Sequence, residues 1–396
     1  MTLLYNARVV LPDRVVDDGW VLVEGARIVE VGAGPRPAER DAVDLDGNWL
    51  LPGFVDLHMH GGGGHDLTAS PEALAQAVAF HRRHGTTRTL ASLVTAPLAD
   101  LERQLGWVAD LAAEDGPLVG AHLEGPYLSH LRCGAQNPAH LRTPDRAELA
   151  GLVRAARGTL RSVTVAPELP GALDIVRDTV AAGAIAAIGH TDATYAQAQQ
   201  AIAAGATLAT HLFNGMRPVH HREPGPVGAA LAADLACEII NDGVHVHPAI
   251  TALVARTPGR LVLVTDAIDA AGMGDGDVEL GGQRVRVRGG EARLVSSGSL
   301  AGSTLTMDAA LRRAVQDCGI PVVEASRAAS GTPARLLGLR HRFGAVEPGL
   351  AADLVVLDEA LAVTGVLAGG SWEAETVTDL VQTNPITGLD HSSGVR

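Results

Sequence analysis

Eight short apolar runs, each preceded or followed by a helix-like stretch, recur between residues 52 and 266 of the chain. They follow one another at intervals of roughly 20 to 45 residues, a spacing typical of repeated units in which helices connect parallel strands. The runs are Gly53–His60, Thr87–Thr95, Leu118–Glu124, Ser162–Pro167, Ile185–His190, Thr207–His211, Glu238–Asp242 and Leu261–Asp266. Eight such units predict an α/β protein with a (β/α)8 TIM barrel.

Strand-like stretches also occur outside this region, at both ends of the chain. They are Leu3–Val10, Trp20–Glu24 and Arg27–Val31 before the barrel, and Ala352–Leu357 and Val363–Ala368 after it. We expect a small β-sandwich-like domain formed by both termini, with residues 1–50 and 344–380 contributing to it. Residues 51–343 would form the catalytic barrel, and residues 381–396, which end in small polar side chains, a flexible tail.

Side chains of the types that bind metals stand at the C-terminal ends of the predicted strands. In a barrel these ends meet at one mouth, where active sites form. Taken singly, a glutamate there is more often a helix cap or an ion-pair partner, and a histidine more often a hydrogen-bonded core residue. Six such positions together favour a catalytic metal site of nitrogen and oxygen ligands, suited to Zn²⁺ or Fe²⁺. The six are His58, His60, Glu124, His190, His211 and Asp266.

All 31 basic residues other than histidine are arginines, and the chain contains no lysine. This absence excludes a P-loop lysine, a Schiff-base lysine and a carboxylated lysine that bridges two metals. Glu124 is therefore the candidate bridging carboxylate. A metal lowers the pKa of a bound water to about 7, so Asp266 is the candidate carboxylate that carries the proton of that water, although a lone aspartate there could equally cap a loop.

The overall charge and hydropathy of the chain restrict its partners and location. A formal net charge of −14 and the absence of a long basic run argue against nucleic acid. The apolar runs are shorter than the roughly 20 residues that a membrane-spanning helix needs, and the N-terminus lacks the pattern of a signal peptide. We expect no membrane association and a cytoplasmic location, with Cys133, Cys237 and Cys318 as reduced thiols.

An ordered series of motifs between about Pro52 and Met307 resembles the amidohydrolase superfamily, and within it the N-acetylglucosamine-6-phosphate deacetylases. The motifs are PGFVDLHMHGGGG (52–64), HLEGPYL (122–128), GHTDAT (189–194), THLFNGM (210–216), REPG (222–225), DGVHV (242–246), LVTDA (263–267) and SLAGSTLTM (299–307). The resemblance implies metal-dependent hydrolysis of the acetamide of N-acetylglucosamine 6-phosphate to glucosamine 6-phosphate and acetate.

The same resemblance implies roles for individual residues. Glu124, His190 and His211 match the main metal site of the family, and Asp266 matches its catalytic acid/base. Some members lack one histidine of the His58–His60 pair and use one metal, whereas this chain keeps both histidines. One or two divalent ions are therefore expected, zinc first and iron second.

The resemblance also implies a binding site for an amino-sugar phosphate, with part of the phosphate pocket supplied by a second subunit of a homodimer. Arginine suits the phosphate because its guanidinium matches that group with two hydrogen bonds. The expected substrate-binding residues are Ala135, Gln136, Asn214, Gly215, Arg222, Asp242, His245, Leu300, Ala301 and Gly302.

One position departs from the family pattern. The loop after the third strand usually contains Gly-x-His-Asn-Pro, and here it is Gly134-Ala-Gln136-Asn-Pro138. The Gln136 amide can donate a hydrogen bond to the substrate carbonyl but carries no positive charge. This substitution leaves two alternatives open: a related substrate such as N-acetylgalactosamine 6-phosphate, or a catalytically weak barrel that acts as a binding protein. The intact ligand set and Asp266 argue against the second.

Overall fold

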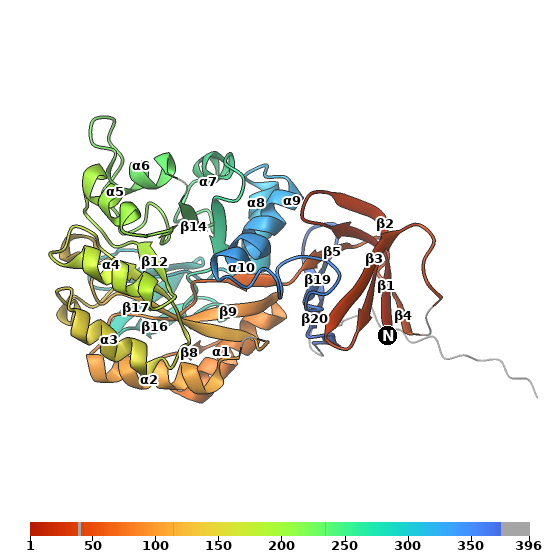
Figure 1. Cartoon of the computed structure of the whole chain (residues 1–396), viewed down its shortest axis with the longest axis horizontal. Helices are drawn as coiled ribbons and strands as arrows, with labels where there is room; N and C mark the ends of the chain where they lie inside the picture. The colour runs from red at the N-terminus through yellow and green to blue at the C-terminus, as the bar shows by residue number, and fades with distance from the viewer. Residues whose placement is uncertain (39–40, 114, 234, 374–396) are drawn as a thin grey trace, which may run out of the picture.

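The computed structural model describes residues 1–38, 41–113, 115–233 and 235–373 (Figure 1). The expected tail at 381–396 lies outside the described residues, as does the end of the 344–380 segment. None of the described helices is long and apolar enough to span a lipid bilayer.

A parallel sheet of eight strands forms the centre of the larger domain, in the order β15-β14-β13-β12-β11-β10-β9-β6. The segments that follow its two end strands meet through backbone hydrogen bonds, from the Asp266 N–H to the His58 carbonyl and from the His60 N–H to the Ala267 carbonyl. The predicted TIM barrel is confirmed, and each strand falls in or overlaps one of the eight predicted runs. The strands are β6 (Phe54–Asp56), β9 (Thr86–Leu93), β10 (Leu118–Glu124), β11 (Leu160–Val165), β12 (Ile185–Ile188), β13 (Leu208–Ala209), β14 (Ala236–Ile240) and β15 (Leu261–Val264).

Helices alternate with these strands and surround the sheet (Figure 1). The first helix shows how the sequence sets their limits: the Ser70 side chain caps the N–H of Ala73, Pro71 opens the helix, and Leu74, Ala77 and Val78 are buried against the sheet. The helices are α1 (Pro71–Arg83), α2 (Leu98–Leu111), α3 (Arg146–Ala155), α4 (Ala172–Ala181), α5 (Tyr195–Ala203), α6 (Gly225–Ala232), α7 (Pro248–Ala255), α8 (Met307–Gln316), α9 (Val322–Ser326) and α10 (Thr332–Leu336).

The two ends of the chain come together in a second, mixed sheet at one end of the molecule (Figure 1). N-terminal strand β5 lies between β1 and the C-terminal strand β19, so neither end builds the sheet alone. The expected small β-domain formed by both termini is confirmed. Its strands are β1 (Thr2–Val10), β2 (Val15–Glu24), β3 (Arg27–Ala33), β4 (Asp41–Asp44), β5 (Trp49–Pro52), β19 (Leu354–Leu357), β20 (Val363–Ala368) and β21 (Ser371–Trp372).

An antiparallel three-stranded sheet is inserted after the last barrel strand, and the sequence analysis did not predict it. It consists of β16 (Gly276–Leu280), β17 (Gln283–Arg288) and β18 (Glu291–Leu294). A smaller hairpin, β7 (Gly61–Gly62) and β8 (His65–Asp66), follows the first barrel strand. Both insertions follow the C-terminal ends of barrel strands, which is the end of a barrel that carries the site.

Candidate metal centre

Two buried histidines follow strand β6 and face the same way. His58 and His60 are separated by one residue, so their side chains project from one face of the extended chain. Their Nε2 atoms lie 3.1 Å apart. Nδ1 of His60 donates to the carbonyl oxygen of Ser92 at 2.9 Å, which leaves its Nε2 free to bind a cation.

Glu124, at the end of β10, lies between two further histidines. Its Oε1 is 3.0 Å from Nε2 of His190 and 2.9 Å from Nε2 of His211, and those two nitrogens are 3.1 Å apart. Nδ1 of His190 donates to the carbonyl oxygen of Arg132 at 2.9 Å. Three ligand-type atoms from strands β10, β12 and β13 therefore converge on one point.

Asp266, directly after β15 and Thr265, joins the His58–His60 pair. Its Oδ1 lies 3.1 Å from Nε2 of His60 and 3.5 Å from Nε2 of His58. Nε2 of His58 is also 3.5 Å from Oε1 of Glu124, so the two sets of residues adjoin. The six side chains thus form two groups, His58–His60–Asp266 and Glu124–His190–His211, each with ligand atoms within 4.8 Å of one another.

The chemistry of these groups fits a divalent cation. All six residues are buried, and burying a carboxylate without a compensating charge is costly. Imidazole Nε2 and carboxylate oxygen are the donors that Zn²⁺ and Fe²⁺ bind in proteins. The structure therefore offers ligand sets for one or two ions, as the sequence led us to expect.

The electrostatics of the site show how strongly these groups interact. Burial by itself would raise the pKa of Glu124, but His58, His190 and His211 outweigh it and hold that pKa well below its usual range. Burial likewise opposes ionisation of Asp266, while His58 and His60 lower its pKa to about 2. Both carboxyl groups are thus ionised near neutral pH and available to a cation.

Three of the six residues adopt a strained backbone conformation. His190, His211 and Asp266 have positive φ angles of 45°, 25° and 49°. Such angles in residues other than glycine cost roughly 1–3 kcal/mol each and concentrate at functional sites. Each of the three residues lies two positions after a barrel strand. At that position the positive φ angle turns the chain so that the side chain points to the centre.

Glu238 on β14 contacts this centre, although the sequence analysis took it only as the first residue of a strand. Its Oε2 accepts hydrogen bonds of 3.2 Å from Nδ1 of His58 and from the backbone N–H of His211. The side chain is buried. An acidic residue within the apolar run Ala236–Ile240 needs a buried partner, so the sequence marks Glu238 as unusual but does not name the histidines that it contacts.

His122 is a second residue that the sequence analysis did not place in the site. Its ring lies 4.7 Å from the ring of His58, edge to face. Nδ1 is 3.0 Å from the Ser92 hydroxyl and Nε2 is 2.8 Å from the Thr164 hydroxyl, which in turn is 2.8 Å from that of Thr210. Burial, together with the charge of His58, holds the pKa of His122 well below its usual range. His122 is thus a neutral side chain that supports His58 from inside the barrel.

A cavity of about 260 Å³ opens onto the centre and contains most of the expected substrate-binding residues. Its lining includes His60, Glu124, His190, His211 and Asp266 from the metal-type groups. Of the expected substrate-binding residues, it includes Ala135, Gln136, Asn214, Gly215, His245, Leu300 and Gly302.

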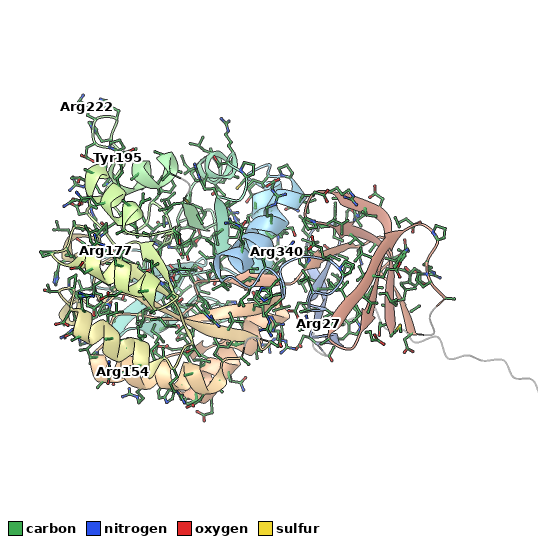
Figure 2. All side chains as sticks on the ribbon, viewed as in Figure 1. Arg27, Arg154, Arg177, Tyr195, Arg222 and Arg340 are labelled. Atoms are coloured by element: carbon green, nitrogen blue, oxygen red, sulfur yellow. The ribbon has the colours of Figure 1, made fainter. Side chains whose placement is uncertain are left out.

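Three expected substrate-binding residues lie outside this lining. Ala301 is fully buried. Asp242 stands behind His245 and accepts a 2.7 Å hydrogen bond from its Nδ1. Arg222 lies at the tip of a loop that stands away from the body of the molecule (Figure 2), where it is exposed and forms hydrogen bonds with its neighbours His220 and His221.

Gln136 lies beside Glu124 with its amide in a defined orientation. The side-chain oxygen accepts a 2.8 Å hydrogen bond from the backbone N–H of Thr95. The side-chain nitrogen donates to Oε2 of Glu124 at 2.5 Å. The donor end of the amide therefore faces the centre. The residue lies at the edge of the cavity, and only 5% of its surface is exposed.

Comparison with known proteins connects this geometry to a family. A model described as the amidohydrolase family matches residues 49–389. An N-acetylgalactosamine-6-phosphate deacetylase of Escherichia coli O157:H7 is 39% identical over 370 residues, 92% of this chain and 97% of that protein. An N-acetylglucosamine-6-phosphate deacetylase of Bacillus subtilis is 37% identical over 368 residues, 90% and 92% of the two chains.

Solved structures agree with these relatives. A mutant N-acetyl-D-glucosamine-6-phosphate deacetylase of Mycobacterium smegmatis, in complex with N-acetyl-D-glucosamine-6-phosphate, is 46% identical, with a TM-score of 0.90 over 94% of this chain and 98% of that one. An N-acetylglucosamine-6-phosphate deacetylase of Thermotoga maritima is 33% identical, with a TM-score of 0.85 over 94% and 99%. The resemblance seen in the sequence motifs is confirmed.

Proposed function

Because the chain belongs to the amidohydrolase family, we propose that it removes the acetyl group from N-acetylglucosamine 6-phosphate, giving glucosamine 6-phosphate and acetate. It is a hydrolase that acts on a linear amide C–N bond, as its relatives are named. The observation that carries the proposal is the buried convergence of Glu124, His190 and His211 next to His58, His60 and Asp266, at the bottom of a cavity that Gln136 borders.

Glu124, His190 and His211 would hold the principal cation, and His58, His60 and Asp266 offer ligands for a second. When bound, a divalent cation polarises the amide carbonyl and lowers the pKa of a water to about 7. The mixed nitrogen and oxygen donors favour zinc, with iron as the alternative. The backbone carbonyls of Ser92 and Arg132 fix the tautomers of His60 and His190, so that Nε2 carries the lone pair in both rings.

Asp266 acts as the general base and then as the general acid. Its carboxylate lines the cavity, with Oδ1 3.1 Å from Nε2 of His60. It accepts a proton from the attacking water and passes that proton to the amine nitrogen as the C–N bond breaks. The amine leaves only when protonated, so one carboxylate serves both halves of the reaction.

Gln136 stabilises the developing negative charge on the carbonyl oxygen of the substrate. Its amide nitrogen has two protons, of which one is directed to Glu124. The second is available to the substrate, and the Thr95 N–H prevents the amide from turning its oxygen towards the cavity. A neutral donor of this kind contributes through a fixed orientation rather than through charge.

The sugar phosphate would extend towards the residues that follow strands β13 and β14. Asn214, Gly215 and His245 line that side of the cavity, and Asp242 orients the His245 ring. Ala135, Leu300 and Gly302 also line the cavity, and Ala301 is buried next to Leu300 and Gly302 in the chain. No arginine of the described chain lines the cavity, although a phosphate dianion needs a cationic partner.

Arg222 supplies this cation from a second copy of the chain in our proposal. Its loop stands away from the body of the molecule (Figure 2), Arg222 is not among the residues that line the cavity, and no carboxylate of the described residues pairs with it. A projecting loop whose guanidinium faces no carboxylate of the described residues suits donation to a neighbour, and this arrangement requires a homodimer. The charged phosphate of the substrate opposes transfer across a lipid bilayer, so the enzyme must act in the compartment where the substrate is made, and we propose that this is the cytoplasm.

N-acetylgalactosamine 6-phosphate is the second candidate substrate. Two observations favour it: Gln136 departs from the usual histidine, and the relative that is 39% identical is named for that epimer. The two sugars differ only in the configuration of one hydroxyl group. Values of kcat/KM for both epimers, measured on the same preparation, decide between them.

Acetate release from N-acetylglucosamine 6-phosphate by the purified protein tests the proposed function. Metal content is determined on the same sample, with unphosphorylated N-acetylglucosamine as the control substrate. We expect turnover that chelation abolishes and that needs the phosphate. A metal-loaded, folded protein that releases acetate from neither epimer would show that the site serves another substrate or a binding role.

A further inference from the structure

The tip of the β16–β17 hairpin closes one side of the cavity. Leu280 and Gln283 pair across a two-residue turn, Gly281-Gly282, whose φ angles of +56° and +77° only glycine adopts without strain. A Cβ atom on Gly281 would lie 3.4 Å from Cγ2 of Val94. The turn therefore rests on Val94, the residue that follows barrel strand β9.

A hydrogen bond fastens this tip to the loop that carries Gln136. Nε2 of Gln283 donates to the carbonyl oxygen of Ala135 at 2.5 Å. Behind the tip, the inward side chains of the hairpin pack with residues of the barrel mouth in one apolar cluster. Its buried members are Val94, Ile268, Ala270, Leu280, Val285, Val287, Ala292, Leu294 and Ala301.

Val94 and Leu280 form the edge of this cluster that reaches the cavity. Both line it, together with Glu124, Gln136 and Asp266, and they are only 6% and 7% exposed. The hairpin holds them from behind, so they form a wall that cannot move away without disrupting the cluster. This wall is apolar and lies on the same side of the cavity as Gln136, because Gln136 bonds to Thr95, the residue after Val94.

The opposite side of the cavity is polar. Asn214, Gly215 and His245 come from the segments after β13 and β14. In the barrel order three strands separate β13 from β9, and β14 is the next strand after β13. A molecule that spans the cavity therefore meets hydrogen-bonding groups at one end and an apolar wall at the other.

We propose that Val94 and Leu280 form the acyl pocket of the enzyme and restrict its substrates to short N-acyl groups. The proposal rests on the proposed function. In an N-acetylated hexosamine 6-phosphate, every ring carbon and C6 bears oxygen or nitrogen, and the acetyl methyl is the one wholly apolar group. That methyl is bonded to the carbonyl carbon under attack, so it must lie beside the metal-type residues. The apolar wall at that place fits it.

The size of the effect follows from the chemistry of apolar pockets. One added methylene in a closed apolar pocket changes kcat/KM by roughly 10- to 200-fold. Since both wall residues are buried and supported by the hairpin, the wild-type enzyme should prefer the N-acetyl substrate over N-butyryl-glucosamine 6-phosphate by at least about 100-fold. N-propionyl-glucosamine 6-phosphate should fall between them.

The experiment compares kcat/KM for the three N-acyl substrates in wild type and in variants. Leu280→Ala and Val94→Ala should each reduce the preference for acetyl over butyryl by roughly tenfold. Val94→Ile, which adds a methylene to the pocket, should shift the preference the other way, towards N-formyl-glucosamine 6-phosphate. The matched control is Val278→Ala, on the same strand and packed against the same cluster but outside the cavity lining, and it should keep the wild-type ratios.

The outcomes separate the two proposals. If wild type deacetylates the acetyl substrate but the three pocket variants keep its acyl preference within twofold, the acyl pocket is elsewhere and the proposed function stands. If wild type releases no carboxylic acid from any of the substrates, both proposals are wrong. Binding constants of the same N-acyl substrates to an Asp266→Ala background, measured by calorimetry, give a readout without turnover. They should show the same order of preference and the same response to Leu280→Ala.

Discussion

The side-chain nitrogen of Gln136 lies 2.5 Å from Oε2 of Glu124, and the opposite end of the same amide is fixed by the backbone of Thr95. A residue that departs from the family pattern is thus in direct contact with a metal-type residue of the site. Because the backbone decides which end of the amide faces the cavity, Gln136 presents a donor there in the absence of any positive charge.

Replacement of Gln136 by alanine removes this donor. We expect kcat to fall by roughly 10²–10³-fold, the usual effect of deleting one donor to a developing oxyanion, while the bound metal content stays the same. Gln136→His restores a ring N–H and should recover most of the turnover. Steady-state kinetics and metal analysis of the two variants test this, and a Gln136→Ala enzyme with wild-type kcat would assign carbonyl polarisation to another group.

Glu238 should control metal affinity although it lies outside both ligand groups. It accepts hydrogen bonds from Nδ1 of His58 and from the backbone of His211, so it orients one histidine of each group. Removing such a supporting carboxylate costs roughly 10- to 100-fold in metal affinity. Competition with a chromophoric chelator should show this loss for Glu238→Gln. Glu279→Gln, exposed on β16, is the control, and equal affinities in the two variants would contradict the assignment.

Arg222→Ala should raise KM and leave kcat close to that of wild type. A lost charge-assisted hydrogen bond to phosphate is worth roughly 1.5–3 kcal/mol, which corresponds to about a 10- to 150-fold loss in kcat/KM. Arg177→Ala, on the outer surface of α4 where Arg177 pairs with Asp174, is the matched control and should behave as wild type.

Mixed dimers show whether Arg222 acts on its own chain or on a neighbour. Chains with Arg222→Ala and chains with Asp266→Ala are co-expressed with different tags, and the heterodimer is isolated. If Arg222 acts across the interface, one of the two sites in each heterodimer has both wild-type residues, and kcat/KM returns to about half the wild-type value. Failure to recover activity in a verified heterodimer would place Arg222 in its own subunit's site or outside catalysis.

Acidification should destabilise the fold through His81, a fully buried residue on α1 whose Nε2 donates to the Gly61 carbonyl at 2.9 Å. Burial, aided by the charge of His84, lowers the pKa of His81 to about 4, from an ordinary value of 6.5. Above pH 6.5 this residue is neutral in both states and has no effect. Between pH 6.5 and 4 the unfolded chain binds a proton that the folded chain does not, so the unfolding free energy falls by about 1.4 kcal/mol per pH unit on account of this residue.

Urea unfolding at a series of pH values measures this contribution. In His81→Gln, which keeps a donor for Gly61 but does not titrate, the slope of unfolding free energy against pH should be lower by about one proton over that range. His341→Gln removes an exposed imidazole and provides the comparison. Identical slopes in wild type and His81→Gln would mean that His81 is protonated in the folded protein.

The barrel and its six metal-type residues could be predicted because each lies in a strong local pattern. A short apolar run followed by His190, His211 or Asp266 carries both the strand and the ligand in adjacent residues, and the barrel brings such strand ends together. The small β-domain was predictable for the same reason, since its strands alternate or are continuously apolar. The pairing of β5 with β19 joins strands some 300 residues apart in the chain. It could be inferred only because the strands at each end of the chain require neighbouring strands to complete a sheet.

Other parts of the site depend on contacts that no local pattern reveals. Leu280 and Gln283 flank a Gly-Gly turn between alternating runs, so the hairpin itself had a signal in the sequence. Its position over Val94 did not, because it depends on how the insertion folds back onto the barrel mouth. Glu238 and His122 are single polar residues within apolar strands, and their role is visible only once His58 is placed beside them. The position of Arg222 outside its own cavity also needed the structure.

The bonds that close the barrel, between His58 and Asp266 and between His60 and Ala267, connect the first strand of the barrel to the last. A cation shared by His58, His60 and Asp266 would tie together two points separated by 208 residues (266 − 58). Such a cross-link closes a very long loop of the chain. Cross-links that close long loops stabilise the folded state most, because they remove the most conformational entropy from the unfolded chain. The metal would thus serve as a removable cross-link. Its supply would set the unfolding free energy of the barrel as well as the rate of the reaction.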